Sequence, residues 1–201
     1  MTKCVCEYFG LATRQKSLKS LCLHHCLRLQ VAQIRPVILG AILRNITFTS
    51  QNYASFIDLQ DKLHQNLGRR RTLVSMGTHD LDTIQAPFMY YGMAPSKVKF
   101  APLNKPDQVM DGHSLILTLE SDRHLSRYLS IIRDSPVYPV VLDKNWTVCS
   151  LPPIINSEHS KITLNTKNVF IEMTGTDETR CISALAELTG MISEYCEDKY
   201  T

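Results

Sequence analysis

The sequence predicts an α+β fold, that is, a mixed α/β domain with mixed sheets flanked by helices. Short β-branched apolar runs alternate along the chain with stretches whose apolar residues recur at helical spacing, and this alternation is typical of such domains. Of the 201 residues, 44% are hydrophobic and 20% are charged, as in an ordinary globular protein. Because no apolar run reaches about 18 residues, we expect no membrane-spanning segment and no membrane partner.

Composition divides the chain into an unassigned leader, residues 1–33, and one main domain, residues 34–201. The leader has five basic residues and one acidic residue, a balance of +4 in a chain whose net charge is +3. The main domain is therefore close to neutral. Since proteins that hold nucleic acid by phosphate neutralisation are more basic than this, we expect RNA to be gripped chiefly by other parts of an assembly.

The leader contains four of the seven cysteines, and these have the ligand types of a zinc site. They are Cys4, Cys6, Cys22 and Cys26, with His24 and His25 beside the last two. The spacing matches no standard zinc finger, so we predict no metal and no cofactor. An odd number of cysteines and no signal-peptide pattern favour a reducing, cytoplasmic location, although a basic, acid-poor head is also typical of an organelle-targeting segment.

The first predicted element of the main domain is a buried strand in the apolar, β-branched run Ile34–Phe48. Gly40 interrupts this run, so two strands with a bulge at the glycine are the alternative. Arg35 and Arg44 are the charges embedded in it. We expect both at exposed strand ends rather than in contact with a ligand.

A helix follows, capped by Thr49 or Ser50 and stopped by Gly68. Its apolar face comprises Tyr53, Phe56, Ile57, Leu63 and Leu67. Arg69–Arg71 come directly after it, where they complement the helix dipole or contact an RNA backbone.

The next run, Thr72–Met76, predicts a short buried strand that ends at Gly77. The polar cluster 78–83 follows it. A capped one-turn helix explains this cluster, and an acid–base pair formed by His79 and Asp80 is the alternative, because an aspartate can orient an imidazole.

The remaining elements are predicted by periodicity and turn residues. In order they are a hairpin (88–100), a loop (101–112), a helix (112–119), a helix that begins at Ser121 or Asp122, a hairpin (137–142 with 146–151) and a final helix (177 to about 197). The second of these helices directs Leu125, Leu129 and Ile132 inward. The final helix directs inward Ile182, Leu185, Leu188, Ile192 and Tyr195.

The stretch Cys149–Asp177 carries most of the candidate chemistry, as a strand, a Pro-Pro turn, a polar loop, a strand and a helix start. Alternation along the second strand places Phe170, Glu172 and Thr174 on one face. A lone glutamate in an apolar strand is unfavourable to bury unless it has a partner or a ligand, so the alternative is an edge strand with Glu172 in solvent. The sequence shows no motif typical of a nucleophile triad, a phosphate loop or a dinucleotide site.

Several segments resemble the β subunit of archaeal and eukaryotic phenylalanyl-tRNA synthetase over about residues 34–201. They are IRPVILGAILRNITFT, SFIDLQDKLHQN, GTHDLDT, VKFAPLNK, LPPIINSEHSKIT, NTKNVFIEMTGTD and SEYCE. In that family this region is the B3/B4 editing module, which hydrolyses tyrosine wrongly esterified to the phenylalanine tRNA. The resemblance implies an aminoacyl-tRNA ligase subunit fragment with ester hydrolase activity, unable to charge tRNA alone. Its implied partners are aminoacylated tRNA(Phe) and, within a complete β subunit, the synthetase α subunit.

An editing module is useful because tyrosine is phenylalanine with an added hydroxyl. The apolar pocket of a synthetic site rejects such a hydroxyl by only about 10²-fold. A second site that hydrogen-bonds the phenol discriminates better, since phenylalanine would leave its polar groups unpaired. On this resemblance the candidate catalytic residues are Ser150, Asn156 and His159. The candidate substrate-binding residues are Glu172, Thr174, Thr176, Pro152, Pro153, His79 and Asp80, and Ser160 is a further candidate.

The alternative function is a truncated, non-catalytic module that binds tRNA or assembles with another subunit. The unmatched leader and the weak basic charge of the chain motivate this alternative. Because the module ends at Thr201 without a natural terminal tail, we expect the reading frame to have been cut or the gene to be partial.

Overall fold

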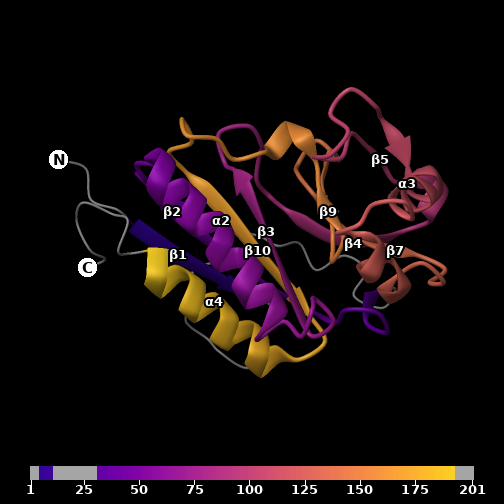
Figure 1. Ribbon diagram of the computed structural model, residues 1–201, viewed down its shortest axis with the longest axis horizontal. Helices are drawn as coiled ribbons and strands as arrows, with labels where there is room; N and C mark the ends of the chain where they lie inside the picture. The colour runs from indigo at the N-terminus through magenta and orange to yellow at the C-terminus, as the bar shows by residue number, and fades with distance from the viewer. Residues whose placement is uncertain (1–4, 11–30, 193–201) are drawn as a thin grey trace.

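A four-stranded antiparallel sheet, the main sheet, organises the fold in this computed structural model, which describes residues 5–10 and 31–192. Its strands, in spatial order, are β1 (Val5–Gly10), β2 (Val37–Arg44), β10 (Val169–Gly175) and β3 (Val74–Asp80) (Figure 1). Strand β10 is therefore central, and β3 is an edge strand. The expected α+β class is confirmed, and every pairing among the described strands is antiparallel.

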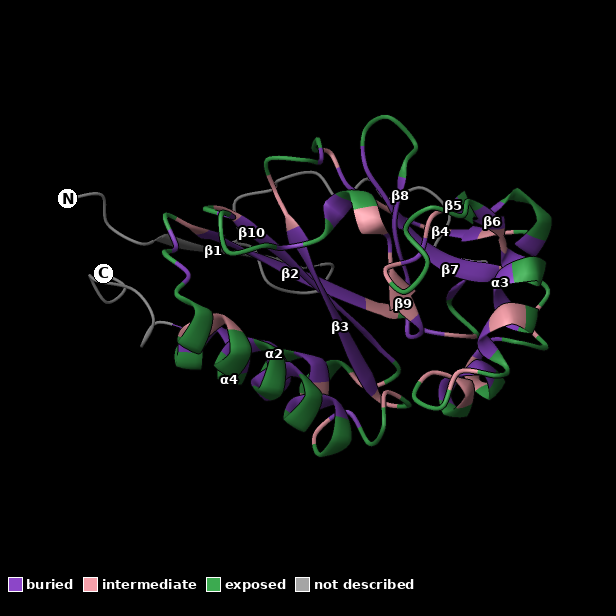
Figure 2. Cartoon of the chain, turned by 45° about the horizontal axis from the view of Figure 1, so that its top comes forward, coloured by how far each residue is buried: buried purple, intermediate pink, exposed green. Residues whose placement is uncertain are grey.

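Two helices, α2 (Ser50–Gln65) and α4 (Glu178–Ile192), cover one face of the main sheet (Figure 1). Thr49 is the N-cap of α2: its hydroxyl accepts from the Asn52 N–H at 3.2 Å, and Asn52 Oδ1 accepts from the Thr49 N–H at 2.6 Å. This reciprocal cap satisfies two donors that a helix start leaves open. Figure 2 shows the outer faces of both helices exposed and the strands beneath them buried.

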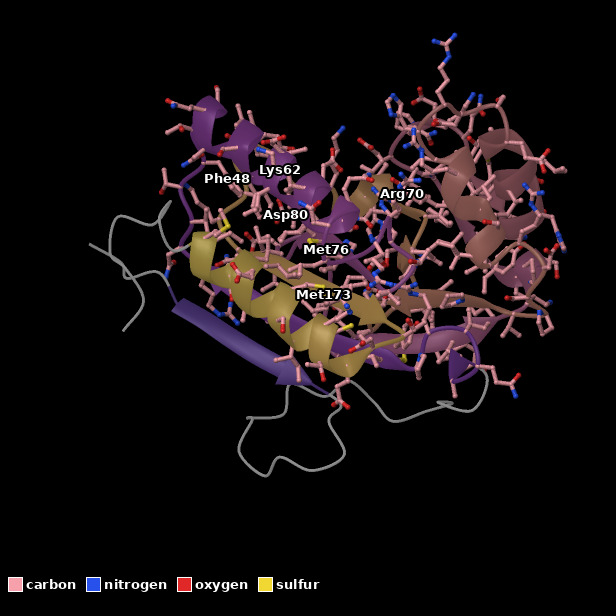
Figure 3. All side chains as sticks on the ribbon, turned by 60° about the horizontal axis from the view of Figure 1, so that its bottom comes forward. Phe48, Lys62, Arg70, Met76, Asp80 and Met173 are labelled. Atoms are coloured by element: carbon pink, nitrogen blue, oxygen red, sulfur yellow. The ribbon has the colours of Figure 1, made fainter. Side chains whose placement is uncertain are left out.

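The core under these helices consists of alternate residues from the strands. Met76 of β3 and Met173 of β10 lie opposite one another in the strand register and both belong to this core (Figure 3). Because side chains alternate along a strand, the residues between them point to the other face of the sheet.

A second sheet lies against that other face. Its order is β4 (Met89–Met93), β7 (Tyr138–Leu142), β8 (Val148–Leu151) and β9 (Ile155–Asn156). Phe88, just before β4, stacks on Phe170 of β10 with ring centroids 4.2 Å apart. Apolar residues of β2, such as Ile42, pack with those of the second sheet in the same cluster. The main sheet thus has helices on one face and a sheet on the other.

Short elements enclose the far side of the second sheet around a separate apolar cluster. They are η1 (Pro95–Lys97), β5 (Lys99–Phe100), β6 (Met110–Asp111), α3 (Gly112–Leu119) and η2 (Ser126–Ile131), with η3 (Glu158–Ser160) following β9. No helix in the described ranges is both long and apolar enough to span a bilayer.

Several expected elements are confirmed. The helix 112–119 is α3, and the hairpin around residues 143–145 is β7–β8, where Asp143 Oδ1 accepts from the Asn145 and Thr147 N–H groups at 2.8 and 3.0 Å. The run Ile34–Phe48 forms one strand, β2, and its pairing passes through Gly40 without a register shift.

Other expectations were wrong. The strand expected to end at Gly77 continues to Asp80, so His79 and Asp80 belong to β3 and not to a one-turn helix. The hairpin 88–100 does not form, because β4 pairs with β7 and β5 pairs with β6. Strand partners are chosen by long-range packing, which a local alternating pattern does not specify.

Two side-chain orientations and one helix type also differ from expectation. Ile57 and Ile182 are 38% and 52% exposed, so neither points into the core. The helix expected after residue 121 is the 3-10 segment η2, although Asp122 Oδ1 does cap its approach by accepting from the His124 and Leu125 N–H groups. The end of the final helix, with Tyr195, lies outside the described residues.

Part of the segment that the sequence left unassigned belongs to the main sheet. Strand β1, residues 5–10, pairs with β2 along its whole length. The other leader positions before residue 31 lie outside the described ranges, so Cys4, Cys22 and Cys26 of the suggested zinc site are not placed.

Candidate functional site

Glu172 of β10 is the buried charge at the centre of the candidate site. In the register it lies opposite Gly40 on β2 and Gly77 on β3. A Cβ at Gly77 would lie 2.5 Å from Glu172 Oε1 and 2.9 Å from its Cγ. The glycine therefore leaves the space that the glutamate side chain occupies. At 2% exposed on a central strand, Glu172 does not face solvent, and the edge-strand alternative was wrong.

The Glu172 carboxylate is only partly hydrogen-bonded. Ser150 of β8 donates to Oε1 at 2.6 Å, whereas Oε2 is buried and has no hydrogen-bond partner in the part of the chain that the structure describes. His79 Nε2 lies 3.9 Å from Oε1, beyond hydrogen-bond length, and is likewise unpartnered. An unpaired buried carboxylate oxygen is costly unless a ligand or a water supplies a donor.

His79 is held behind Glu172 by its neighbours. Its Nδ1 shares a 2.9 Å hydrogen bond with Ser160 Oγ, and its ring stacks on Phe170 at a centroid distance of 5.8 Å. The imidazole is fully buried. These contacts fix the ring with Nε2 toward the glutamate.

The free edge of β3 is covered by side chains instead of another strand. The Met76 N–H donates to His64 Nε2 at 2.9 Å, and the Thr78 carbonyl accepts from Asn156 Nδ2 at 3.3 Å. An edge strand must satisfy its backbone groups in some such way when it is buried. Helix α2 and strand β9 are thereby held on either side of the edge, with a gap between them.

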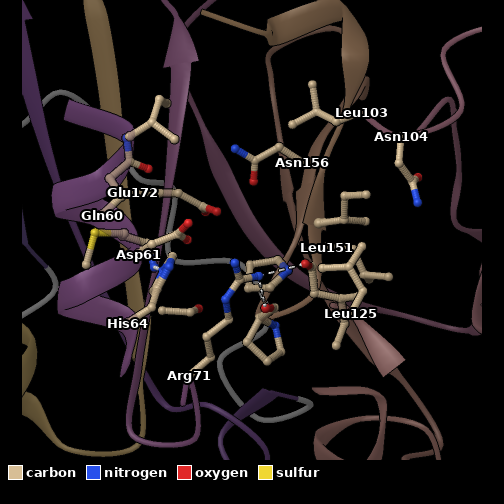
Figure 4. A pocket seen from close by; sticks show the side chains of 17 residues that line it. Gln60, Asp61, His64, Arg71, Leu103, Asn104, Leu125, Leu151, Asn156 and Glu172 are labelled. Atoms are coloured by element: carbon tan, nitrogen blue, oxygen red, sulfur yellow. Dashed lines mark hydrogen bonds between the residues drawn. The ribbon is translucent and has the colours of Figure 1, made fainter. Parts of the chain in front are cut away.

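A pocket of about 320 Å³ occupies this gap (Figure 4). In Figure 4, Gln60, Asp61 and His64 of α2 line one side with Glu172, and Leu103 and Leu151 lie across from them. The remaining lining residues are Ile57, Arg71, Ser75, Met76, Asn104, Leu125, Pro152, Pro153, Ile154, Ile155 and Asn156. The volume is at the small end of the range for ligand sites and suits one amino acid side chain.

Arg71 joins the two sides of this pocket. Its Nη1 donates to the Pro153 and Ile154 carbonyls at 3.2 and 2.9 Å, and its guanidinium lies over the Tyr128 ring, 4.5 Å from the centroid. Burial lowers the pKa of Arg71, but a guanidinium stays charged at neutral pH. The Arg71 side chain therefore connects the Pro-Pro turn to the segment that follows α2.

The backbone around Arg71 is unusual. Arg69, Arg70 and Arg71 have φ values of 43, 54 and 64°, a left-handed turn of three non-glycine residues. Each such residue is disfavoured by about 1–2 kcal/mol, so tertiary contacts must hold the turn. In one of these contacts, the Arg71 carbonyl accepts a hydrogen bond from Arg35 Nη1 at 3.1 Å.

Arg35 was expected at an exposed strand end, and this was wrong: it is 0% exposed and precedes β2. Its guanidinium donates to Thr174 Oγ1 (3.2 Å), the Thr174 carbonyl (2.7 Å), Ser75 Oγ (3.2 Å) and the Thr72 carbonyl (3.3 Å). These acceptors, together with the Arg71 carbonyl, offset the desolvation that lowers the pKa of Arg35. None of them is adjacent to Arg35 in sequence. Arg44 is half-buried at the end of β2.

The structure brings some of the predicted site residues together. Glu172, Asn156, Pro152 and Pro153 line the pocket. Ser150 and His79 lie directly behind Glu172, and Ser160 lies behind His79. Thr174 shares the Glu172 face, but its hydroxyl is engaged by Arg35 and Ser75.

The other predicted residues lie apart from the pocket lining. Asp80 Oδ2 accepts from Thr166 Oγ1 at 2.6 Å. Thr176 is exposed beyond the end of β10, and His159 is exposed with Nδ1 at 2.8 Å from Ser157 Oγ. Partial desolvation of the ring nevertheless lowers the pKa of His159. Within the described ranges, no three His, Cys, Asp or Glu side chains are arranged to hold a metal ion.

The comparisons with known proteins identify the family. The family model of the B3/4 domain matches residues 29–197. This chain belongs to the B3/4 domain family. It is 55% identical over 172 residues to the phenylalanine–tRNA ligase β subunit of Caenorhabditis elegans and 51% identical over 172 residues to that of Homo sapiens. Each alignment covers 86% of this chain and 29% of the relative, so the chain spans less than a third of their length.

A solved structure shares the B3/4 fold of this chain. It is the crystal structure of an N-terminal fragment of the phenylalanyl-tRNA synthetase β subunit from Pyrococcus horikoshii, with a TM-score of 0.78 at 32% identity. The superposition covers 83% of this chain and 47% of that fragment. The expected family is therefore confirmed.

The sequence did not predict the helix-side wall of the B3/4 pocket. Gln60, Asp61 and His64 form that wall with Arg71. The detectable signal was a polar run on α2 at positions that helical spacing turns toward the sheet: Gln60 and His64 are buried although they are polar.

Proposed function

We propose that this B3/4 chain hydrolyses the ester that joins tyrosine to the phenylalanine tRNA and so removes a wrongly attached amino acid. The observation that carries the proposal is the buried acceptor Glu172 Oε2. It belongs to a residue that lines the pocket, and no described residue donates to it. A tyrosine phenol would donate to it. Phenylalanine has no such donor and would leave the carboxylate oxygen unsatisfied, which is the basis of selective rejection.

The arrangement around Glu172 supports a role in recognising the tyrosine phenol. Ser150 orients the carboxylate through Oε1, and the two opposing glycines leave no side chain to cover it. Because these neighbours hold the carboxylate in place before a ligand arrives, little rearrangement is needed on binding.

Hydrolysis of an activated ester requires a positioned water and pre-set donors, without a covalent nucleophile. Cys149 is a poor nucleophile, because burial raises the pKa of its thiol and leaves no reactive thiolate. In the proposal Asn156, with Pro152 and Pro153, borders the aminoacyl end and the attacking water. Ser150 acts by positioning Glu172, and His79 lies behind the carboxylate without a hydrogen bond to it.

The names of the relatives extend the proposal to partners. Because they are β subunits of phenylalanine–tRNA ligase, we infer that the chain meets aminoacylated tRNA(Phe) and works beside the α subunit when it is part of a complete β subunit. The remaining parts of such an assembly would supply aminoacylation and most of the electrostatic grip on RNA.

The test is deacylation of Tyr-tRNA(Phe) and Phe-tRNA(Phe) by the purified chain. Glu172→Gln keeps the shape of the side chain and removes its charge, and we expect a roughly 10- to 100-fold loss in kcat/KM for the tyrosyl ester with little change for the phenylalanyl ester. Glu187→Gln, an exposed glutamate on α4, is the matched control. Thr174→Ala tests the second expected residue on the same strand face.

Unchanged kinetics in Glu172→Gln would show that this carboxylate does not read the phenol. A chain that binds labelled tRNA but leaves both esters intact would instead support the non-catalytic tRNA-binding or assembly module. Titration at two salt concentrations measures how much of that binding is electrostatic.

A further inference from the structure

Unsatisfied polar atoms gather at the pocket. In the described part of the chain, five buried side-chain atoms lack a hydrogen-bond partner: His64 Nδ1, Arg71 Nε, His79 Nε2, Glu158 Oε2 and Glu172 Oε2. Three of them, on His64, Arg71 and Glu172, belong to residues that line the pocket. Such groups are rare in native proteins, and a shared location points to a bound molecule that satisfies them together.

His64 supplies a hydrogen-bond donor. Its Nε2 accepts from the Met76 N–H at 2.9 Å, which requires the neutral tautomer with the proton on Nδ1. Burial, reinforced by the nearby Arg71 charge, lowers the pKa of His64 well below its ordinary value, so this tautomer persists at neutral pH. The residue is 4% exposed, and its Nδ1–H has no acceptor among the described residues.

Arg71 supplies a second donor. Its Nη1 is already engaged by the Pro153 and Ile154 carbonyls, which fixes the guanidinium plane, and its Nε–H is left over. The Tyr128 ring beneath it restricts the side chain further. The pocket therefore has unpaired donors on His64 and Arg71, in addition to the unpaired acceptor on Glu172.

We propose that His64 Nδ1–H and Arg71 Nε–H bind the carbonyl oxygen of the substrate ester and stabilise the negative charge that develops on it. This rests on the proposed function. Once the phenol donates to Glu172, the ester carbonyl is the group of a tyrosyl ester that needs donors during hydrolysis. A backbone phosphate is a poorer match, because the two donors are buried on residues that line a small pocket, whereas Arg69 and Arg70 are exposed.

The chemical step is balanced without a cofactor. The oxygen of water forms a bond to the carbonyl carbon, and the π electron pair moves onto the carbonyl oxygen between the two donors. When that pair returns, the bond to the ribose oxygen breaks, and the ribose oxygen takes a proton that came from the water. Tyrosine and uncharged tRNA are the products.

Two substitutions of His64 separate the donor from its structural role. In His64→Gln the amide oxygen can take the place of Nε2 and accept from Met76, while the donor at Nδ1 is lost. In His64→Asn the amide nitrogen lies near the position of Nδ1, and the acceptor for Met76 is lost. We expect His64→Gln to lower kcat for Tyr-tRNA(Phe) by about 10²- to 10³-fold at nearly unchanged KM.

His64→Asn is expected to retain most of kcat and to unfold at a lower temperature. Equal kcat in His64→Gln and the unmodified chain overturns the proposal. Equal losses of kcat in the two folded variants also overturn it, because the Met76 contact would then explain both. Arg70→Ala, in the same left-handed turn but exposed, is the control for general effects on that segment.

A second measurement uses the unmodified chain and needs no tRNA. The product carboxylate offers the same kind of acceptor as the ester carbonyl, whereas tyramine has the phenol and the amine without it. We expect L-tyrosine to shift the His64 Nδ1 resonance in a ¹⁵N spectrum of the histidine rings, and tyramine to leave it unchanged. No shift at the highest soluble concentration of tyrosine, or equal shifts with both compounds, overturns the inference.

The two proposals fail in different ways. If the unmodified chain does not hydrolyse Tyr-tRNA(Phe), the proposed function is contradicted. The comparison of tyrosine with tyramine then tests alone whether His64 and Arg71 bind the acceptor oxygen. A chain that hydrolyses the ester with His64→Gln as active as the unmodified protein contradicts the donor pair alone.

Discussion

The two faces of the main sheet differ although the same strands build both. On the helix face, β10 contributes Val169, Ile171 and Met173 to an apolar core under α2 and α4. On the other face it contributes Glu172 and Thr174, buried to the same degree. Burial therefore does not distinguish the two faces. What distinguishes them is that the polar face holds groups whose hydrogen bonds are only partly made within the protein.

The difference follows from how each face is closed. Helices present apolar stripes that fill the space above their face at high density. The opposite face meets the second sheet through the apolar cluster that includes Phe170 and through Ser150 of β8. Near Glu172 it is also bordered by Gly77 and the pocket. The helix face is expected to control stability, and the polar face to control selectivity. The predictions below test that division.

The largest effect on stability is expected on the helix face. Leu188→Ala removes a fully buried side chain of α4 from the core. We expect the free energy of unfolding to fall by about 2–5 kcal/mol, from lost apolar burial and the cavity left behind. Urea unfolding measures this loss, and the tyrosyl-to-phenylalanyl ratio in deacylation should stay constant in the folded variant. A loss below about 1 kcal/mol would place Leu188 outside the core.

On the polar face, Gly77→Ala should change the preference for the tyrosyl ester more than Leu188→Ala does. The new methyl group would meet Glu172 Oε1 at 2.5 Å and force the carboxylate from its position. We expect a loss of stability of about 1–3 kcal/mol from overpacking, with loss of most of the preference for the tyrosyl ester. Unfolding and deacylation measured on one preparation test this prediction. Retained preference would show that the position of Glu172 is not critical.

The pH dependence of stability should show that the pKa of His64 differs between the folded and unfolded states. Its pKa is lowered in the folded chain and ordinary, near 6.5, in the unfolded chain, so the unfolded state binds more protons below pH 6.5. The stabilisation is complete above about pH 6.5 and is lost as the pH falls toward the folded-state pKa, by about 1.4 kcal/mol per pH unit.

Urea unfolding between pH 5 and 7.5 measures this slope. The variant His64→Gln cannot titrate at this position and should show a shallower dependence than the unmodified chain. Parallel slopes in the two proteins would mean that His64 titrates alike in the folded and unfolded states.

The smallest effect is expected far from the site. Gly190 is an exposed position within α4, and a Cβ added there meets nothing within 4 Å. Gly190→Ala should therefore raise stability by about 0.5–1 kcal/mol, because glycine loses more chain entropy than alanine on entering a helix. The variant is also the alanine control for Gly77→Ala. A destabilised Gly190→Ala would indicate a contact that its helical position does not reveal.

Local patterns predicted the parts of the fold that depend on local physics. The cap at Thr49, the helix 112–119 and the β7–β8 hairpin were each predictable from capping residues, spacing or turn residues. The alternation that places Glu172 and Thr174 on one strand face was predicted for the same reason. These features involve residues within a few positions of one another.

The missed features all depend on distant residues. The burial of Arg35 requires acceptors from residues 36 to 139 positions away, and no local pattern shows them. His79 lies in a strand because β10 pairs with β3 through that position, whereas its own neighbours, Thr78 and Asp80, suggested a capped turn. His64 could not be read as part of the site because its wall of the pocket exists only where α2 lies along the edge of β3.

By itself, the sequence determined the fold class, the strand face that carries Glu172 and, through resemblance, the family. Alternation and capping are properties of short segments, so they can be predicted without the tertiary structure. The tertiary structure alone decided which polar groups stay unpaired. That outcome depends on every neighbour that burial brings together. Among the described residues, Glu172, His64 and Arg71 each carry an unpaired group and line the same pocket.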